Sequence, residues 1–192
     1  MDKIVLSAQS LLDDSYRLAG RVLASGFKPT IIIAIWRGGA PVGMAVQEFV
    51  RYCGVNTDHI AIRTSSYTGV DQRRGQVRVM GLDYIINKVT PDHRLLIVDD
   101  VFDTGHTIAA VLQAIRKQAR GNTPREMRVA VPWFKPTRNQ TDLTPDYFVH
   151  ETDAWLVFPH ELDALTPDEM RRERPALHDV VVPLRADRKA AS

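Results

Sequence analysis

The sequence has one cysteine, no long hydrophobic run and almost no net charge, and each of these absences excludes a class of protein. Cys53 is the only cysteine among 192 residues, so an internal disulfide is impossible and a reducing, cytoplasmic setting is expected. No apolar stretch approaches the length of a membrane span, and we expect neither a secretory signal nor a membrane partner. A net charge of +2 is too small to indicate nucleic-acid binding.

The order of apolar segments indicates an α/β fold. Runs rich in β-branched residues predict strands at 30–36, 58–64, 94–101 and 126–134, with shorter ones at 146–150 and 154–158. Apolar residues at helical spacing predict helices at 7–25, 42–53 and 105–119. Such alternation predicts a mainly parallel, twisted sheet with helices on both faces. Pro132 predicts that its strand ends nearby or lies at an edge, and the tail from Pro167 is expected to be helical, then extended, with its last eight residues frayed.

The segment from Leu95 to Ile108 carries the strongest chemical signal. It reads Leu-Leu-Ile-Val-Asp-Asp-Val-Phe-Asp-Thr-Gly-His-Thr-Ile, which is an apolar strand, a hydroxyl-rich turn and a helix start. The backbone N–H groups and the helix dipole at such a turn favour a phosphate. Adjacent aspartates at 99 and 100 suit ribose hydroxyls or a divalent cation, so the residues indicate a sugar phosphate with magnesium. A plain helix cap is the alternative, but a cap needs only one such residue.

This segment closely resembles the signature of the type I phosphoribosyltransferases, in which an acidic pair runs into an Asp-Thr-Gly-X-Thr loop. The resemblance implies that Asp99 and Asp100 hold the ribose hydroxyls of phosphoribosyl pyrophosphate (PRPP). It also implies that the loop wraps the 5′-phosphate with Asp103, Thr104, Gly105, His106 and Thr107. In this family an aspartate at the place of Asp103 lies near the purine imidazole ring, where it would accept a proton or stabilise charge.

Two other segments resemble PRPP-binding loops of the same family. Arg37, Gly38 and Gly39 follow the strand at 30–36 and resemble the pyrophosphate loop, where glycine allows close backbone approach and arginine suits phosphate oxygens. Residues 65–81 predict a long loop, and Ser65, Ser66 and Tyr67 resemble the start of the flexible loop that closes over the pyrophosphate. A turn shaped by glycine and an ordinary surface loop are the plain alternatives.

The segment from Trp155 to Glu161, with Lys135 before it, resembles the base-binding stretch of the 6-oxopurine (hypoxanthine/xanthine/guanine) phosphoribosyltransferases. The resemblance implies that Lys135 contacts the purine 6-oxygen, that Trp155 stacks on the base, and that the main chain of Leu156 meets its Watson–Crick edge. An ammonium donor fits a carbonyl and argues against adenine. A surface lysine and core aromatics are the alternative. His160 stands where many relatives have an aromatic residue, which leaves the base preference open.

The combined prediction is one phosphoribosyltransferase domain over residues 1–192, with a core at about 26–135 and a small base-binding hood at about 135–170 that includes the N-terminal helix. The implied reaction is Mg²⁺-dependent transfer of the phosphoribosyl group from PRPP to hypoxanthine, xanthine or guanine in purine salvage, with Arg37 and Asp103 as catalytic residues. Asp99, Asp100 and Glu161 are the expected magnesium contacts, partly through PRPP. A homodimer or higher homo-oligomer is expected by analogy. A non-catalytic sensor of PRPP or purine and a pyrimidine phosphoribosyltransferase remain alternatives.

Overall fold

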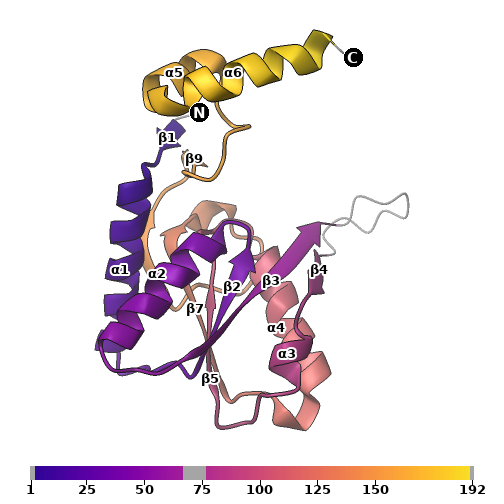
Figure 1. The fold of residues 1–192 in the computed structure, drawn as a ribbon. Coiled ribbons are helices and arrows are strands. Elements are labelled where there is room, and N and C mark those ends of the chain that lie inside the picture. The colour runs from indigo at the N-terminus through magenta and orange to yellow at the C-terminus, as the bar shows by residue number, and fades with distance from the viewer. Residues whose placement is uncertain (1–2, 67–76, 191–192) are drawn as a thin grey trace. The chain divides into compact units, whose positions relative to one another are not determined.

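The computed structural model describes residues 3–66 and 77–190, and the chain divides into two compact units (Figure 1). Residues 9–153 form the core unit, and residues 1–8 together with 154–192 form the terminal unit. Among the described helices, none combines the length and the apolar character that crossing a membrane would need.

The core unit is built on a mostly parallel sheet, as the sequence predicts. Its strands are β2 (Ile31–Trp36), β3 (Asp58–Ser66), β4 (Val77–Met80), β5 (Arg94–Val98), β6 (Val101–Phe102), β7 (Glu126–Phe134) and β8 (Tyr147–Glu151). The strand order runs β4-β3-β2-β5-β7, and β8 pairs with the other edge of β7. Each described pair in this sheet is parallel except β3 with β4. The carboxyl ends of the parallel strands therefore share one edge, where ligands of such sheets bind.

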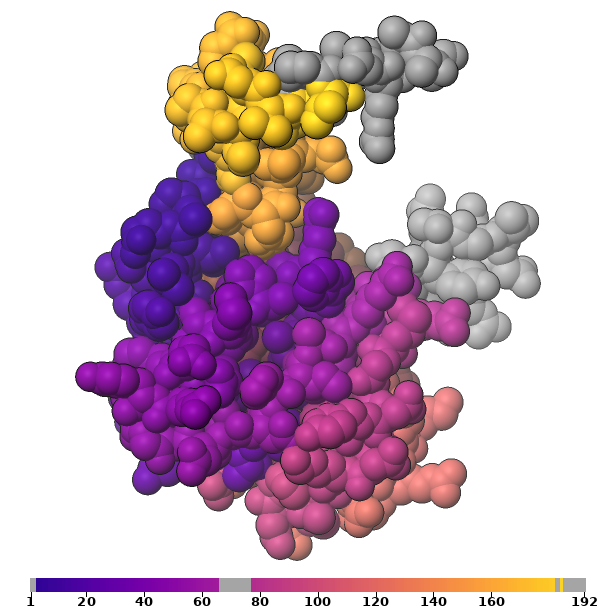
Figure 2. Space-filling model, in the orientation of Figure 1, coloured from indigo at the N-terminus to yellow at the C-terminus, as the bar shows by residue number. Residues whose placement is uncertain are grey.

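Helices cover both faces of this sheet (Figure 1). On one side lie α1 (Ala8–Ala24) and α2 (Gly39–Tyr52), and on the other lie α3 (Asp83–Ile86) and α4 (His106–Ala119). Successive side chains of β2 lie on opposite faces of the sheet and so contribute to both helix layers. Ile31, Ile33 and Ile35 join the core beneath α3 and α4, whereas Ala34 faces α2. Short 3₁₀-helices η1 (Arg120–Asn122) and η2 (Pro136–Arg138) follow α4 and β7. Residues of α2, β3, β4 and α3, coloured purple to magenta, form much of the face of the core unit shown in Figure 2.

The strand predicted at 94–101 is interrupted at Asp99 and Asp100. Both β5 and β6 pair with β7 in the same register, so they are two segments of one interrupted strand. The interruption lies opposite Val131 and Pro132, and proline has no N–H to give to the ladder. Pro132 predicted a nearby strand end or an edge strand, and the first alternative is confirmed, because β7 ends at Phe134. β7 is not an edge strand, since it pairs with β5 and β6 on one side and with β8 on the other.

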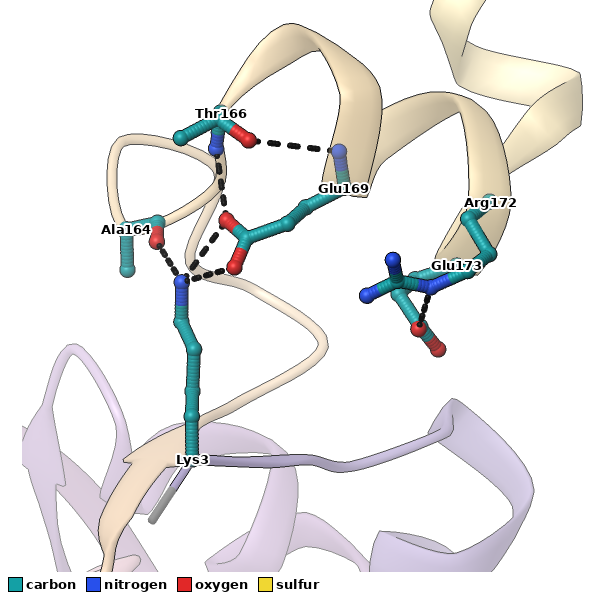
Figure 3. Close-up of polar contacts among 6 residues, drawn as sticks. All are labelled: Lys3, Ala164, Thr166, Glu169, Arg172 and Glu173. Carbon is teal, nitrogen blue, oxygen red and sulfur yellow. Dashed lines mark hydrogen bonds and ion pairs between the residues drawn. The ribbon is translucent and has the colours of Figure 1, made fainter. Parts of the chain in front are cut away.

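The terminal unit joins both ends of the chain. β1 (Lys3–Val5) pairs in parallel with β9 (Trp155–Val157), and α5 (Pro167–Glu173) and α6 (Pro175–Ala190) follow. The ammonium of Lys3 donates to the carbonyl of Ala164 and to Glu169, each at 2.8 Å (Figure 3). Glu169 also forms a capping box with Thr166 at the start of α5. The hydrogen bond from Lys3 and then that from the Thr166 backbone lower the pKa of Glu169 to about 2.

Most predicted elements are confirmed, and the differences have identifiable causes. The helix expected from residue 42 begins at Gly39, and Gly38 is the N-cap residue before it. Residues 65–81 are not all loop: β3 extends to Ser66 because it pairs with β4, which lies within the predicted loop. The tail is helical through Ala190 rather than extended and frayed. Pro175 begins α6, where proline is tolerated, and Val181 packs against the small core around Met170.

A substitution at Gly43 tests how closely α2 packs against the sheet. A Cβ at this position would lie 2.6 Å from the Cβ of Ala34 on β2. We expect Gly43→Ala to lower the melting temperature by about 2–10 °C, because overpacking costs about 1–3 kcal/mol in a domain of this size. The measurement is thermal unfolding followed by circular dichroism.

Gly20→Ala is the matched control. Gly20 is also helical, and a Cβ built there would have Phe49 Cζ, at 4.0 Å, as its nearest neighbour. Gly20→Ala should leave the melting temperature unchanged or raise it, since alanine has a higher helix propensity than glycine. Equal shifts in the two variants would contradict the close packing of α2.

Candidate active site

The acidic pair lies against the two glycines at the start of α2. A Cβ built at Gly38 would overlap the carboxylate of Asp100, and one built at Gly39 would lie 2.5 Å from the carbonyl oxygen of Val98 and 2.9 Å from Asp99 Cα. Only glycine fits at these two positions, since any side chain would displace the carboxylates or the backbone that holds them. The loop after β2 and the break after β5 are therefore in direct contact. The Trp36–Arg37 peptide bond that leads into this turn is cis.

The environment of the two carboxylates, Asp99 and Asp100, disfavours their ionised form. Asp100 is only 9% exposed, and the side chain of Asp99 accepts hydrogen bonds from the backbone N–H groups of Asp100, at 3.0 Å, and of Gly39. Burial, and then the neighbouring Asp100, raise the pKa of Asp99 well above its usual value, and the two N–H donors only partly oppose this. A cation or a hydroxyl-bearing ligand at this pair would relieve that cost.

The predicted phosphate loop forms the turn between β6 and α4. Gly105 has a φ of +81°, in the left-handed region that favours glycine, and His106 begins the helix. A Cβ at Gly105 would also lie 3.0 Å from both Asn139 Oδ1 and Phe102 Cε1. Thr104, His106 and Thr107 are half-buried, so their backbone and side chains line the start of α4 without being covered. This is the geometry of an anion site at a helix N-terminus.

Lys135 and Asp103 meet at the same edge of the sheet. Lys135 follows β7 and is 5% exposed, and its ammonium lies 3.5 Å from Asp103 Oδ2. The other oxygen of Asp103 accepts a 2.6 Å hydrogen bond from Arg138 Nε. A buried lysine is unusual unless it is paired, so this carboxylate explains why Lys135 can lie there.

The segment after Lys135 contains residues that the sequence analysis missed. Gln140 donates its backbone N–H to the Thr104 carbonyl at 3.0 Å, and its side-chain oxygen lies 3.1 Å from His106 Nε2. Together with Arg138, these contacts fasten residues 136–141 to the phosphate loop. The available signal was a polar run, Arg-Asn-Gln-Thr, directly after a strand end; without the fold it could not be distinguished from an ordinary loop.

The core unit thus brings six of the predicted residues into two contacting groups at the carboxyl edge of its sheet: Gly38 and Gly39 with Asp99 and Asp100, and Asp103 with Lys135. Arg37 is exposed beside them in sequence. Ser65 and Ser66 belong to β3 rather than to a loop, and Tyr67 lies outside the described residues.

Three predicted residues belong to the terminal unit. The ring of Trp155 is half exposed at 50%, as a stacking surface requires, whereas the side chain of Leu156 is buried. A carboxylate oxygen of Glu161 accepts the backbone N–H of Phe158 at 3.3 Å. Their roles in base and metal binding stay predictions.

The described residues contain no group of three or more His, Cys, Asp and Glu side chains arranged to hold a metal by themselves. Asp99 and Asp100 supply the oxygen ligands that Mg²⁺ prefers, and this ion is commonly bound by one or two carboxylates together with substrate phosphates. The pair therefore fits a magnesium ion that arrives with a phosphorylated substrate.

A mostly parallel sheet with an acidic pair and a glycine turn before a helix at its carboxyl edge defines an α/β protein of the kind expected to bind a phosphorylated, hydroxyl-bearing ligand. Comparison with known families shows that residues 3–165 match the phosphoribosyl transferase domain. The chain therefore belongs to this family. The type I resemblance that the sequence motifs indicated is confirmed.

Similar proteins include named purine enzymes. The chain is 25% identical over 170 residues to the hypoxanthine-guanine phosphoribosyltransferase of Bos taurus, covering 85% of this chain and 75% of that one. The crystal structure of a purine phosphoribosyltransferase from Pyrococcus horikoshii is 25% identical, with a TM-score of 0.66 over 86% of this chain and 98% of that one. A Neisseria gonorrhoeae protein crystallised with bound ppGpp has the same fold, with 24% identity and a TM-score of 0.70 over 91% and 97% of the two chains.

The raised pKa of Asp99 makes a prediction about stability without ligand. Between the unfolded value near 3.8 and the raised folded value, the unfolded state loses this proton first, so stability falls as the pH rises. Asp99→Asn removes the charge and keeps an oxygen to accept the two N–H groups. We expect it to raise the melting temperature at neutral pH by at least about 2 °C, as relief of about 1 kcal/mol would do.

The same thermal scans at pH 3 and below supply the control, because the carboxyl group is then mostly protonated in both the folded and the unfolded states, and the difference between the two proteins should shrink. A lower melting temperature for Asp99→Asn at pH 7 would show that the charged pair stabilises the fold.

Proposed function

We propose that the protein transfers the 5-phosphoribosyl group from PRPP to a 6-oxopurine, giving a nucleoside monophosphate and pyrophosphate in purine salvage. The observation that carries the proposal is that one edge of the core unit holds an acidic pair, a phosphate loop and a buried lysine paired with an aspartate. These three features supply the contacts that a ribose, a 5′-phosphate and a base carbonyl each need. Similarity to purine and hypoxanthine-guanine phosphoribosyltransferases supports the choice of base.

The donor would be held at both of its anionic ends. The N-terminus of α4, with the loop at 103–107, provides backbone N–H groups and a positive dipole for the 5′-phosphate. Asp99 and Asp100 accept hydrogen bonds from the ribose hydroxyls. At the other end, Arg37 and the backbone of Gly38 and Gly39 at the start of α2 face the pyrophosphate. This arrangement positions the anomeric carbon between the two ends.

Magnesium would be held by donor oxygens together with Asp99 and Asp100, with Glu161 as the predicted third contact. When bound, it supplies positive charge that stabilises the departing pyrophosphate. Arg37 contributes fixed charge to the same end of the donor, because a guanidinium stays protonated and suits phosphate oxygens. The catalysis is therefore electrostatic stabilisation of a leaving group rather than formation of a covalent enzyme intermediate.

The base would be oriented by Lys135 and Asp103. The ammonium of Lys135 donates to the 6-oxygen, and Asp103 accepts the proton on the imidazole ring of the purine. As the bond from the anomeric carbon to pyrophosphate breaks, its electron pair leaves with the pyrophosphate, and the free imidazole nitrogen forms the new bond. The proton passes to Asp103, so the product base is neutral. Stacking by Trp155 and edge contacts by the Leu156 main chain complete the prediction.

A panel of bases tests the function directly. The protein, PRPP and Mg²⁺ are mixed with hypoxanthine, xanthine, guanine, adenine, uracil or orotate, and nucleotide is measured by chromatography. We expect product with at least one 6-oxopurine, little with adenine, and loss of activity with EDTA that added Mg²⁺ restores. Product only with uracil or orotate would contradict the purine assignment. PRPP binding without product from any base would point instead to a sensor.

Asp103→Asn tests the proton acceptor. The amide keeps the shape of the side chain but cannot take a proton, so kcat should fall by about 10²–10⁴-fold, the usual contribution of a general base. Donor affinity, measured by calorimetry with PRPP and Mg²⁺, should change far less than kcat. Unchanged turnover would remove Asp103 from the reaction.

A further inference from the structure

Asp103 meets a different cation on each of its oxygens, at unequal distances. Arg138 Nε donates to Oδ1 at 2.6 Å, which is a short charge-assisted hydrogen bond. Lys135 Nζ lies 3.5 Å from Oδ2, which is an ion pair too long for a good hydrogen bond. The side chain of Asp103 is 33% exposed, and that of Arg138 is 44% exposed. Arg138 is thus the tight partner and Lys135 the loose one.

This arrangement presents a conflict when a base binds. The proposed function directs the ammonium of Lys135 to the 6-oxygen of the purine, and the same ammonium pairs with Asp103 in the structure described here. A partly buried carboxylate that loses its cation is costly, because its charge is then uncompensated in a region of low dielectric. Asp103 must also keep its orientation at that moment in order to accept the proton from the base.

We infer that Arg138 is a positioning residue for the transfer reaction: it keeps Asp103 paired and oriented while Lys135 turns to the base. The inference rests on the proposed function and deepens it. Arg138 acts through Asp103 and on Oδ1 alone, which leaves Oδ2, the oxygen on the Lys135 side, to meet the base. The loose partner is the one that moves, and the tight partner stays.

Backbone hydrogen bonds on both sides of Arg138 hold this segment beside Asp103. Its backbone N–H donates to the Lys135 carbonyl at 3.2 Å within η2. Two residues on, Gln140 donates to the Thr104 carbonyl at 3.0 Å, in the same loop that carries Asp103. The backbone that carries Arg138 is therefore held on both sides, and the planar shape of the guanidinium sets the direction of its hydrogen bond to Asp103, which a lysine ammonium would not do.

Arg138→Ala and Arg138→Lys test the inference, with Arg125→Ala as the matched control. Arg125 forms an ion pair of the same 2.6 Å length with Asp92, on residues that are mostly exposed. Arg138→Ala should lower kcat with the preferred 6-oxopurine by about 10–100-fold, as misplacement of a catalytic group does. The Kd for PRPP with Mg²⁺ should stay within about twofold, and Arg138→Lys should recover part of kcat. Arg125→Ala should behave as the unmodified protein.

A double-mutant cycle separates this role from a merely structural one. In the Asp103→Asn background, Arg138→Ala should cost less than about twofold further in kcat, because the group it positions is already lost. If Arg138→Ala does not fold, as judged by circular dichroism, the cycle is run with Arg138→Lys. Additive losses would overturn the inference.

The outcomes also distinguish the inference from the function on which it rests. If the unmodified protein makes no nucleotide from any base, the proposed function fails and the inference with it. If the unmodified protein is active and Arg138→Ala matches Arg125→Ala, the inference alone is overturned.

Discussion

Two carboxylates packed against two glycines determine how the loops of the core unit meet. Gly38 and Gly39 leave no room for a side chain because Asp100 and the backbone at Asp99 occupy that space. The same packing partly buries Asp99 beside the buried Asp100, and the pKa of Asp99 is raised. The fold therefore retains an unfavourable interaction where a ligand with hydroxyls and a cation can offset it, a pattern expected at functional sites.

A second link joins the part of the site that would hold the base to the part that would hold the donor phosphate. Asp103 belongs to the phosphate loop by sequence, yet its ionic partners Lys135 and Arg138 come from the chain after β7. Gln140 adds a backbone contact and a side-chain contact to the same loop. The two segments are thus joined by charges and hydrogen bonds. The ordering of one loop by its ligand would pre-organise its neighbour.

The sequence predicted what depends on local pattern and missed what depends on tertiary pairing. Strands such as 126–134 and the glycine turn at 105 could be read from residue type, and so could the acidic pair. The extension of β3 to Ser66 could not, because it requires the antiparallel partner β4. Pro132 correctly indicated a nearby strand end, but not that its missing N–H falls opposite the break between β5 and β6, which depends on the register of the strands. Arg138 looked like any exposed loop arginine until Asp103 was seen beside it.

The pairing of β1 with β9 has a consequence for the order in which the protein can be made. Residues 3–5 leave the ribosome before the core unit, whereas their partners at 155–157 follow only after the core unit has been synthesised. β1 therefore stays without its partner strand while the residues of the parallel sheet are synthesised after it. The pairing of β1 with β9 can form only once both ends of the core unit have been made.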